Sequence, residues 1–296
     1  MNNHQSTKQT SDMRKTRTIL LAAAVMAAMA IPAAAQTLRG DFNMDGKVDV
    51  TDVTTAIQSL LYDSMGTVGP EDRDTVMVGD LPLVMVRVHA GTYTRRPGVV
   101  KTVENDFWIG QLEVSMELWK TVMGTYPQTR PNLDTNQPAY PLSVEMSLAF
   151  IDSLNQMTGL EFRLPTPVEW EFAAYGGTMT HGYTYAGSED IDAIAWYRGN
   201  MTEMEGFDEL MGYDSNVIVR QGTKMPNELG LYDMCGGIVE LCGTTFGGEP
   251  LYEYRGGYFR SPAENCDPYV YTRWVYITQV TDGCGMRLAM TATECE

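Results

Sequence analysis

The feature that most limits the fold is the long C-terminal part after Gly176 and Gly177, where helical periodicity is nearly absent. Gly, Tyr and short apolar runs fill this part of the chain to its end. The chain has 28 Gly and 16 Tyr among 296 residues, and 20% of its residues are charged. This composition excludes a helical bundle or a coiled coil and indicates a loop-rich fold. The 44% of hydrophobic residues is enough to bury a core.

Ahead of that part, the sequence predicts two strands and three helices. Apolar runs predict strands over residues 83–88 and 107–109, whereas residues 91–94 are expected to continue into a turn. The three helices are expected from Ser115 to Gly124, from Ser143 to about Gly159, and over residues 167–174. A Ser or a Pro marks the start of each helix, and a Gly marks the end of the first two.

The first 35 residues read as a signal peptide. A basic stretch over residues 13–17 precedes an apolar run over residues 19–31, which is too short to span a bilayer comfortably. Three Ala at 33–35 predict cleavage before Gln36. The alternative is a membrane anchor, which the short run argues against. We therefore expect a periplasmic, cell-surface or extracellular protein with no transmembrane anchor in the mature chain.

Charge and scarce His residues exclude two classes of function. A formal net charge of −17 excludes nucleic-acid binding through a basic surface and suits cation binding. The three His are scattered, which excludes a His-rich iron or zinc site. Export permits disulfides, but the odd number of cysteines leaves at least one without a partner in the chain. The five are Cys235, Cys242, Cys266, Cys284 and Cys295.

Residues 41–52 have the spacing of an EF-hand calcium loop. Oxygen-bearing side chains occupy loop positions 1, 3, 5, 9 and 12, position 7 supplies a backbone carbonyl, and Gly46 at position 6 permits the sharp turn. Apolar residues at helical spacing follow the loop. We expect calcium here, and the alternative is an acidic turn that caps a helix. The expected ligands are Asp41, Asn43, Asp45, Lys47, Asp49 and Asp52.

This EF-hand-like loop and helix, residues 40–63, resemble one repeat of a type I dockerin, because Asp52 replaces the usual Glu and no clear helix precedes the loop. The resemblance implies a cohesin-like partner and a role in a polysaccharide-degrading assembly. A full dockerin has two repeats, and the sequence shows one. The expected parts are a signal peptide (1–35), a dockerin-like calcium repeat (36–63), a linker rich in turn formers (64–80) and a large domain (81–296).

Segments of the large domain resemble, in order, the signatures of the formylglycine-generating enzyme, or sulfatase-modifying factor, family. Residues 107–114 resemble F-x-I-x-x-x-E-V-T, and residues 162–171 resemble R-L-P-T-E-A-E-W-E. Residues 227–240 match N-x-x-G-L-Y-D-M-x-G-N-V-W-E, while residues 255–257 and 285–288 match R-G-G-S and G-F-R-L. The resemblance covers residues 80–290. It implies an α+β, C-type-lectin-like fold with low regular secondary structure.

Enzymes of this family oxidise a substrate Cys to formylglycine with copper and two Cys thiolates, which lie four and nine residues after the Gly-Gly pair. Those positions hold Ser261 and Cys266 here. Thiolates select Cu(I), and a Ser hydroxyl does not replace one. We therefore expect no copper and assign no catalytic residue; a copper-dependent oxidase acting on protein Cys is the alternative. A disulfide with Cys242 is another role for Cys266.

The resemblance also implies a second calcium site, made by the side chains of Asp233 and Glu240 and the carbonyls of Gly236 and Ile238. Two carboxylates around a glycine-rich turn suit calcium, although the family's N-V-W-E-W has become Gly-Ile-Val-Glu-Leu at residues 237–241. Charged residues beside Trp170, namely Arg163, Glu169 and Glu171, are expected to form a structural ion network. The Gly pairs at 236–237 and 256–257 are expected to serve tight turns or close backbone approach.

An aromatic-rich stretch over residues 252–279 completes the sequence reading. Tyr offers contact area at low entropy cost, which suits binding surfaces, and the stretch resembles the variable region of lectin-fold proteins diversified by retroelements. The expected ligand-binding residues are Tyr252, Tyr254, Tyr258, Phe259, Tyr269, Tyr271, Trp274 and Tyr276. The alternative is that about half of them are core. We expect an exported, calcium-stabilised, non-catalytic protein that binds a protein or glycan.

Overall fold

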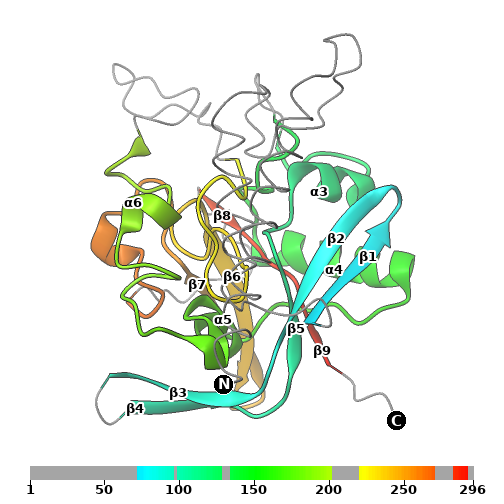
Figure 1. The fold of residues 1–296 in the computed structure, drawn as a ribbon. Coiled ribbons are helices and arrows are strands. Elements are labelled where there is room, and N and C mark those ends of the chain that lie inside the picture. The colour runs from blue at the N-terminus through cyan, green and yellow to red at the C-terminus, as the bar shows by residue number, and fades with distance from the viewer. Residues whose placement is uncertain (1–71, 97–98, 129–133, 202–219, 271–282, 293–296) are drawn as a thin grey trace, which may run out of the picture. The chain divides into compact units, whose positions relative to one another are not determined.

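The computed structural model describes residues 72–96, 99–128, 134–201, 220–270 and 283–292 (Figure 1). The predicted signal peptide and the predicted calcium loop, with its ligands from Asp41 to Asp52, lie outside the described residues. Within the described part, no helix has the length and apolar character that a membrane crossing requires. The account below concerns the large domain.

A four-stranded antiparallel sheet brings the two ends of the domain together. Its strand order is β1-β2-β5-β9. Because β9 pairs with β5, the last strand of the domain lies in the same sheet as the first two (Figure 1). A tight turn at Gly79, whose φ is 61°, joins β1 to β2. The strands are β1 (Arg73–Val78), β2 (Leu81–Val88), β5 (Phe107–Gly110) and β9 (Ala289–Thr291).

The remaining described strands form two smaller sheets. In the order β7-β6-β8, β6 (Val239–Phe246) pairs antiparallel with β7 (Glu249–Arg255) and parallel with β8 (Cys284–Gly285). A separate hairpin of β3 (Gly91–Arg96) and β4 (Val99–Val103) extends to one side of the domain at the lower left of Figure 1.

Local capping signals set the helices. The described helices are α3 (Met116–Met123), α4 (Val144–Thr158), α5 (Pro167–Ala174) and α6 (Ile191–Ile194). Ser115 and Ser143 accept backbone N–H groups at the starts of α3 and α4, and left-handed Gly124 and Gly159 end them. These bounds confirm the three helices expected from the sequence.

Helix α5 is fixed at its start by a capping box and an ion pair. The Thr166 hydroxyl accepts from the Glu169 backbone N at 3.2 Å, and the Glu169 carboxylate accepts from the Thr166 N at 2.8 Å. Arg163 donates to both Glu169 oxygens, at 2.8 and 2.7 Å. Arg163 and Glu169 are therefore paired as expected, in the geometry of a helix cap, whereas Glu171 pairs with Lys101 and Arg255 instead of Arg163.

The core forms on both faces of the four-stranded sheet because alternate residues of a strand point to opposite sides. Met85 of β2 lies in one cluster, in which Trp119 of α3 stacks on Phe150 of α4 at 5.0 Å between ring centroids. Val86, the next residue along, lies in a second cluster with Trp170 and other residues of α5. In Figure 1, α3 and α4 accompany β1 and β2 on one side of the domain.

Two sequence predictions about strands were wrong. Residues 73–78, which the sequence analysis assigned to the linker 64–80, form β1. Every residue of β1 pairs with a residue of β2. Residues 91–94, expected to lead into a turn, belong to β3. In both segments exposed positions interrupt the apolar pattern, and Met77 of β1 is 56% exposed. Pairing with a neighbouring strand, which no local pattern reveals, decides their structure.

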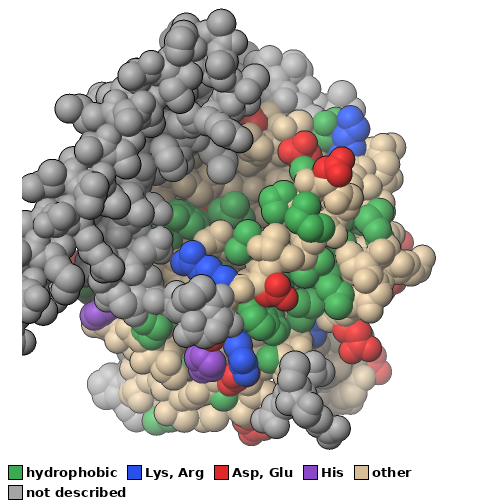
Figure 2. Space-filling model, turned by 45° about the vertical axis from the view of Figure 1, so that its right-hand side comes forward, with side chains coloured by type: hydrophobic (Ala, Val, Ile, Leu, Met, Phe, Trp, Pro, Cys, Tyr) green, Lys and Arg blue, Asp and Glu red, His purple; other side chains and the backbone are tan. Residues whose placement is uncertain are grey.

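Exposed apolar side chains are spread over several elements. Met77 lies on β1, Val100 on β4 and Met157 on α4. On the face in Figure 2, apolar side chains gather between scattered acidic and basic ones. This surface is mixed in character, whereas the loops that follow β7 hold Ser261 and Cys266, the positions at which the family resemblance places the thiolates.

Candidate functional site

Ser261 occupies one of the two positions at which the family resemblance places a catalytic thiolate. It lies in the loop after β7, and it is buried. Its hydroxyl accepts from the Tyr258 backbone N at 3.1 Å, and its own N donates to the Tyr258 carbonyl at 2.7 Å. The Ser261 side chain therefore closes the turn that it belongs to. It supplies no soft ligand.

Cys266 occupies the other position and is fully buried. Burial raises the pKa of its thiol to about 12, with the nearby Glu264 charge adding to the effect. The left-handed Gly257 lies directly against it, because a Cβ at that glycine would be 3.0 Å from the Cys266 sulfur and 2.7 Å from the Asn265 carbonyl. Close backbone approach, expected for this glycine, is confirmed. The thiol is protonated at neutral pH.

The remaining described cysteines are also buried thiols: Cys235, Cys242 and Cys284. Burial raises the pKa of each, to about 12 for Cys284. The disulfide between Cys242 and Cys266 that the sequence allowed is absent, because both are free thiols among the described residues.

Arg287, between β8 and β9, is fully buried and uses all five of its N–H groups. Two of them bind the Glu240 carboxylate, at 2.7 and 2.9 Å. The others donate to the carbonyls of Gly110 and Gln111, at 2.9 and 2.8 Å, and of Tyr232, at 2.8 Å. One side chain thus joins the end of β5, the loop before β6 and β6 itself. No local sequence pattern marks this arginine as the centre of such a network.

Of the two carboxylates implied as calcium ligands, one is already paired with a cation. Glu240 accepts from Arg287 on both oxygens and from the Trp170 indole N at 2.7 Å, so it fits a divalent cation poorly. The Asp233 carboxylate, in contrast, accepts a hydrogen bond from the Gly222 backbone N at 2.6 Å. The Asp233 backbone is left-handed, with a φ of 59°.

The two residues expected to offer carbonyls lie on a tight turn between these carboxylates. Gly236 has a φ of 71°, and a Cβ there would lie 2.2 Å from the Trp196 carbonyl. A side chain is therefore impossible at this glycine without moving the backbone. Ile238 is buried in a small cluster with Tyr140 and Phe259. Calcium at these residues stays a prediction.

The buried Glu113 carboxylate is repelled by the charge of Asp233, and the Arg287 guanidinium attracts both groups. Gln221 donates to the Glu113 carboxylate at 3.0 Å, and the neighbouring Gly222 holds Asp233. The other Glu113 oxygen is buried with no hydrogen-bond partner among the described residues. Burial, followed by the Asp233 charge, raises the pKa of Glu113 well above its usual range. Burial raises the pKa of Asp233 to about 6. The pair therefore favours a bound proton or cation.

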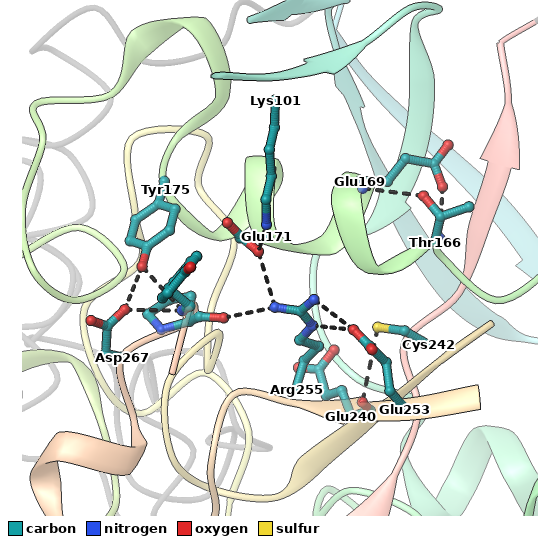
Figure 3. A network of polar contacts seen from close by, with 12 residues as sticks. Lys101, Thr166, Glu169, Glu171, Tyr175, Glu240, Cys242, Glu253, Arg255 and Asp267 are labelled. Carbon is teal, nitrogen blue, oxygen red and sulfur yellow. Dashed lines mark hydrogen bonds and ion pairs between the residues drawn. The ribbon is translucent and has the colours of Figure 1, made fainter. Parts of the chain in front are cut away.

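A second buried network fixes the base of the C-terminal loops. Figure 3 shows Arg255 of β7 between Glu171 and Glu253, with Lys101 of β4 reaching Glu171 from the far side. The Glu171 carboxylate accepts from Lys101 at 2.6 Å and from Arg255 at 3.0 Å. Arg255 also donates to Glu253 at 2.7 Å and to the Pro268 carbonyl at 3.3 Å. Two cations balance two carboxylates, and the loop at Pro268 is tied to β7.

The predicted binding aromatics divide between core and surface. Tyr254 and Phe259 are buried, Tyr254 in the cluster with α3 and α4 and Phe259 in the small cluster beside Tyr140. Tyr252, Tyr258 and Tyr269 are half-buried. The other three predicted residues, Tyr271, Trp274 and Tyr276, lie outside the described residues.

The Asp233 and Glu113 pair predicts a pH dependence of stability. The folded protein holds a proton on Asp233 up to about pH 6, whereas the unfolded chain releases it near pH 4. The contribution of Asp233 to stability is therefore full below about pH 4, is lost as the pH rises from about 4 to 6, and amounts to about 3 kcal/mol. Asp233→Asn keeps the acceptor for Gly222 and removes this loss.

Urea unfolding of wild type and Asp233→Asn between pH 4 and 8, with chelator present, measures the difference. The variant should gain stability relative to wild type as the pH rises. Glu113→Gln should act in the same direction, because burial also raises the pKa of Glu113. A constant difference between variant and wild type across this range would contradict the shared-proton account.

Comparisons with known proteins agree with this geometry. The model of the sulfatase-modifying factor enzyme 1-like domain family matches residues 80–292. The chaperone protein LppX of Paenibacillus barcinonensis is 29% identical over 174 residues, which cover 47% of this chain and 62% of that protein. The chain thus matches somewhat less than two thirds of that relative's length.

Solved structures share the fold at low identity. Treponema denticola variable protein 1 matches with a TM-score of 0.60 and 22% identity, over 74% of this chain and 99% of that one. PvdO from Pseudomonas aeruginosa matches with a TM-score of 0.55 and 18% identity, over 74% and 98%. The expected α+β, C-type-lectin-like fold with low regular secondary structure is confirmed. The chain belongs to the sulfatase-modifying factor enzyme 1-like family.

Proposed function

We propose that this protein is an exported, non-catalytic member of its family that binds a protein or glycan through the loops after β7. The observation that carries the proposal is the state of the two family thiolate positions. Ser261 closes its own turn, and Cys266 is a buried thiol whose pKa burial raises to about 12. Two soft thiolates at one copper ion are therefore missing.

The surroundings of Cys266 support the proposal that this domain keeps the family fold and lacks the copper-dependent oxidation. The cysteines Cys235 and Cys242 lie in the same apolar cluster as Cys266, and each has a pKa raised by burial. Nucleophilic or metal-binding cysteines lie instead in partly exposed sites that lower the thiol pKa. The scaffold of the loop after β7, by contrast, is intact. Arg255 is paired with Glu171 and Glu253, and Gly256 and Gly257 have the left-handed backbone that the turn requires.

Binding is supported by a rigid base that presents half-buried Tyr side chains. Tyr252 projects from β7, Tyr258 follows the Gly256–Gly257 turn, and Tyr269 follows the anchored Pro268. The Tyr269 ring has the Lys101 ammonium 5.3 Å from its centroid. Binding loops work best when supported by locked side chains. LppX is named a chaperone, a class that binds polypeptides, and this favours a protein ligand.

An oxidase assay tests the proposal directly. The mature chain, residues 36–296, is incubated with Cu(I) and then with a Cys-containing peptide, and retained copper and peptide aldehyde are measured by mass spectrometry. We expect neither copper nor aldehyde, because a Ser hydroxyl and a protonated thiol do not bind Cu(I) tightly. An active member of the family, assayed in parallel, is the positive control. Stoichiometric copper with aldehyde would make the protein an oxidase.

Calcium binding and the dockerin-like role belong to the proposal as well. The loop at residues 41–52 carries the oxygen pattern of a calcium site, and a cohesin-like protein is its proposed partner. At the second position, burial raises the pKa of Asp233 and of Glu113 although the Arg287 guanidinium lies near both, and calcium would supply further positive charge. A calcium ion there would keep both carboxylates ionised at neutral pH.

Calcium content of wild type, Asp45→Ala and Asp233→Asn separates the two positions. We expect Asp45→Ala to lose the ion of the 41–52 loop, because this residue is a central ligand. If calcium binds at the second position, Asp233→Asn loses an ion, and calcium added at pH 8 raises wild-type stability by about 3 kcal/mol at a hundredfold excess over Kd. Calcium content unchanged in Asp45→Ala would contradict the proposed loop.

A further inference from the structure

A histidine lies at the end of the four-stranded sheet where β1 begins and β2 ends. His89 follows β2, Asp72 precedes β1, and Asp106 precedes β5. The His89 Nδ1 lies 2.9 Å from an Asp106 carboxylate oxygen, and its Nε2 lies 3.0 Å from an Asp72 carboxylate oxygen. One ring therefore joins the starts of two strands that do not pair with each other.

Both contacts together require a doubly protonated ring. A carboxylate only accepts hydrogen bonds, so each ring nitrogen must donate, and the imidazole ring donates from both nitrogens only as the imidazolium. The Asp106 carboxyl is ionised at neutral pH, because the Ala90 N–H at 2.7 Å, followed by the bonds from His89 and Arg87, lowers its pKa against the effect of burial. The proton of the Nδ1 contact therefore belongs to the ring.

The charges around the His89 ring balance only while the ring is charged. Arg87 of β2 donates to the same Asp106 oxygen, at 3.1 Å from Nε and 2.9 Å from Nη2. Within the described part of the chain, the charged groups that contact this ring or its two carboxylates are Arg87, Asp72 and Asp106. The end of β9 adds a neutral contact, from the Ala292 N to the Asp106 carbonyl at 3.2 Å. Loss of the ring proton leaves one guanidinium for two carboxylates.

The contact to Asp72 is the one that a neutral ring gives up. A neutral imidazole keeps one N–H and turns a lone pair toward the other carboxylate, which repels it. Asp106 stays in place without the ring, because Arg87 and the Ala90 N–H also bind it. Asp72 has no other side-chain partner among the described residues. The remaining N–H therefore stays on Asp106, and Asp72 moves away.

We propose that Asp72, His89 and Asp106 form a pH-sensitive clasp, which holds the start of β1 on the sheet in mildly acid solution and releases it in alkaline solution. The His89 side chain is 52% exposed, so its proton exchanges with solvent, whereas Asp72 and Asp106 are 16% and 24% exposed. Imidazole rings change charge between about pH 5 and 8, which is the range in which the clasp acts. The strand that opens the described part of the domain is thus under the control of pH.

Amide hydrogen exchange of the mature chain at pH 6 and 8, read by peptide mass spectrometry and corrected for the intrinsic exchange rate, tests the proposal. We expect residues 72–78 to exchange about fivefold faster at pH 8 than at pH 6, the size of one exposed charge pair. Helix α4 carries no residue of the clasp. Its amides are the reference for changes in the stability of the whole domain, including the change expected from Asp233.

Two substitutions fix the clasp in opposite states. Asp72→Asn pairs with either form of the ring, because its amide offers an oxygen to an N–H and an NH2 to a lone pair. Residues 72–78 should then exchange slowly at both pH values. His89→Gln never carries a charge, and its single NH2 group replaces two ring nitrogens, so these residues should exchange fast at both.

The matched control is His181→Gln. The His181 ring contacts one carboxylate, that of Glu228, at 3.0 Å from Nδ1, and it holds no second strand. This variant should keep the wild-type pH dependence of residues 72–78. Exchange of α4 at the wild-type rate shows that a variant is folded.

Three results would overturn the proposal. The first is equal exchange of residues 72–78 at both pH values in the wild type. The second is the wild-type pH dependence in His89→Gln, which would assign the effect to another group. The third is a change of the same size in α4, which would assign the effect to the whole domain. None of these measurements involves copper or a ligand, so they leave the proposed function to its own assays.

Discussion

The buried ion pair between Arg287 and Glu240 is the interaction on which the rest of the domain depends. A guanidinium without water is stable only when its charge is paired and its N–H groups are satisfied, and Arg287 meets both conditions. Its partners lie on β5, in the loop before β6 and on β6. Loss of either charge would leave the other unpaired at the junction of the main sheet and the C-terminal loops. The positions of Asp233, Gly236 and the Ser261 loop all follow from this junction.

The domain keeps the scaffold of its family, and the two positions at which the family resemblance places thiolates hold a Ser and a buried Cys. At the left-handed Gly236 and Gly257, a Cβ would lie 2.2 and 2.7 Å from a neighbouring carbonyl oxygen, so the backbone packs closely there only because no Cβ is present. On this preserved frame, Ser261 has become part of a turn and Cys266 has become part of the core. Fold and function separate readily in this way, because function depends on a few side chains placed on a tolerant frame. Among the described residues of these loops, Tyr258 and Tyr269 are half-buried, and Tyr252 of β7 is half-buried as well.

Local signals were readable from the sequence, and long-range ones were not. The caps Ser115, Ser143 and Thr166 act within four residues of themselves, so the helices were predicted closely. Strands β1 and β3 were missed because their partners decide them. Arg287 and Glu240 are 47 residues apart, and nothing local indicates that they meet. The thiolate positions followed from the family resemblance, by counting from the Gly-Gly pair, whereas Glu113 became notable only through its burial and the nearby Asp233 charge.

The most direct test of the central claim is the reactivity of Cys266 in the native protein. Wild-type protein at pH 8, with chelator present, is treated with iodoacetamide, and the modified cysteines are located by peptide mass spectrometry. A buried thiol with a pKa of about 12 should remain unmodified until urea unfolds the chain. Modification of native Cys266 at a rate close to that of the unfolded chain would reveal an accessible thiolate. That result would contradict a non-catalytic role for this domain.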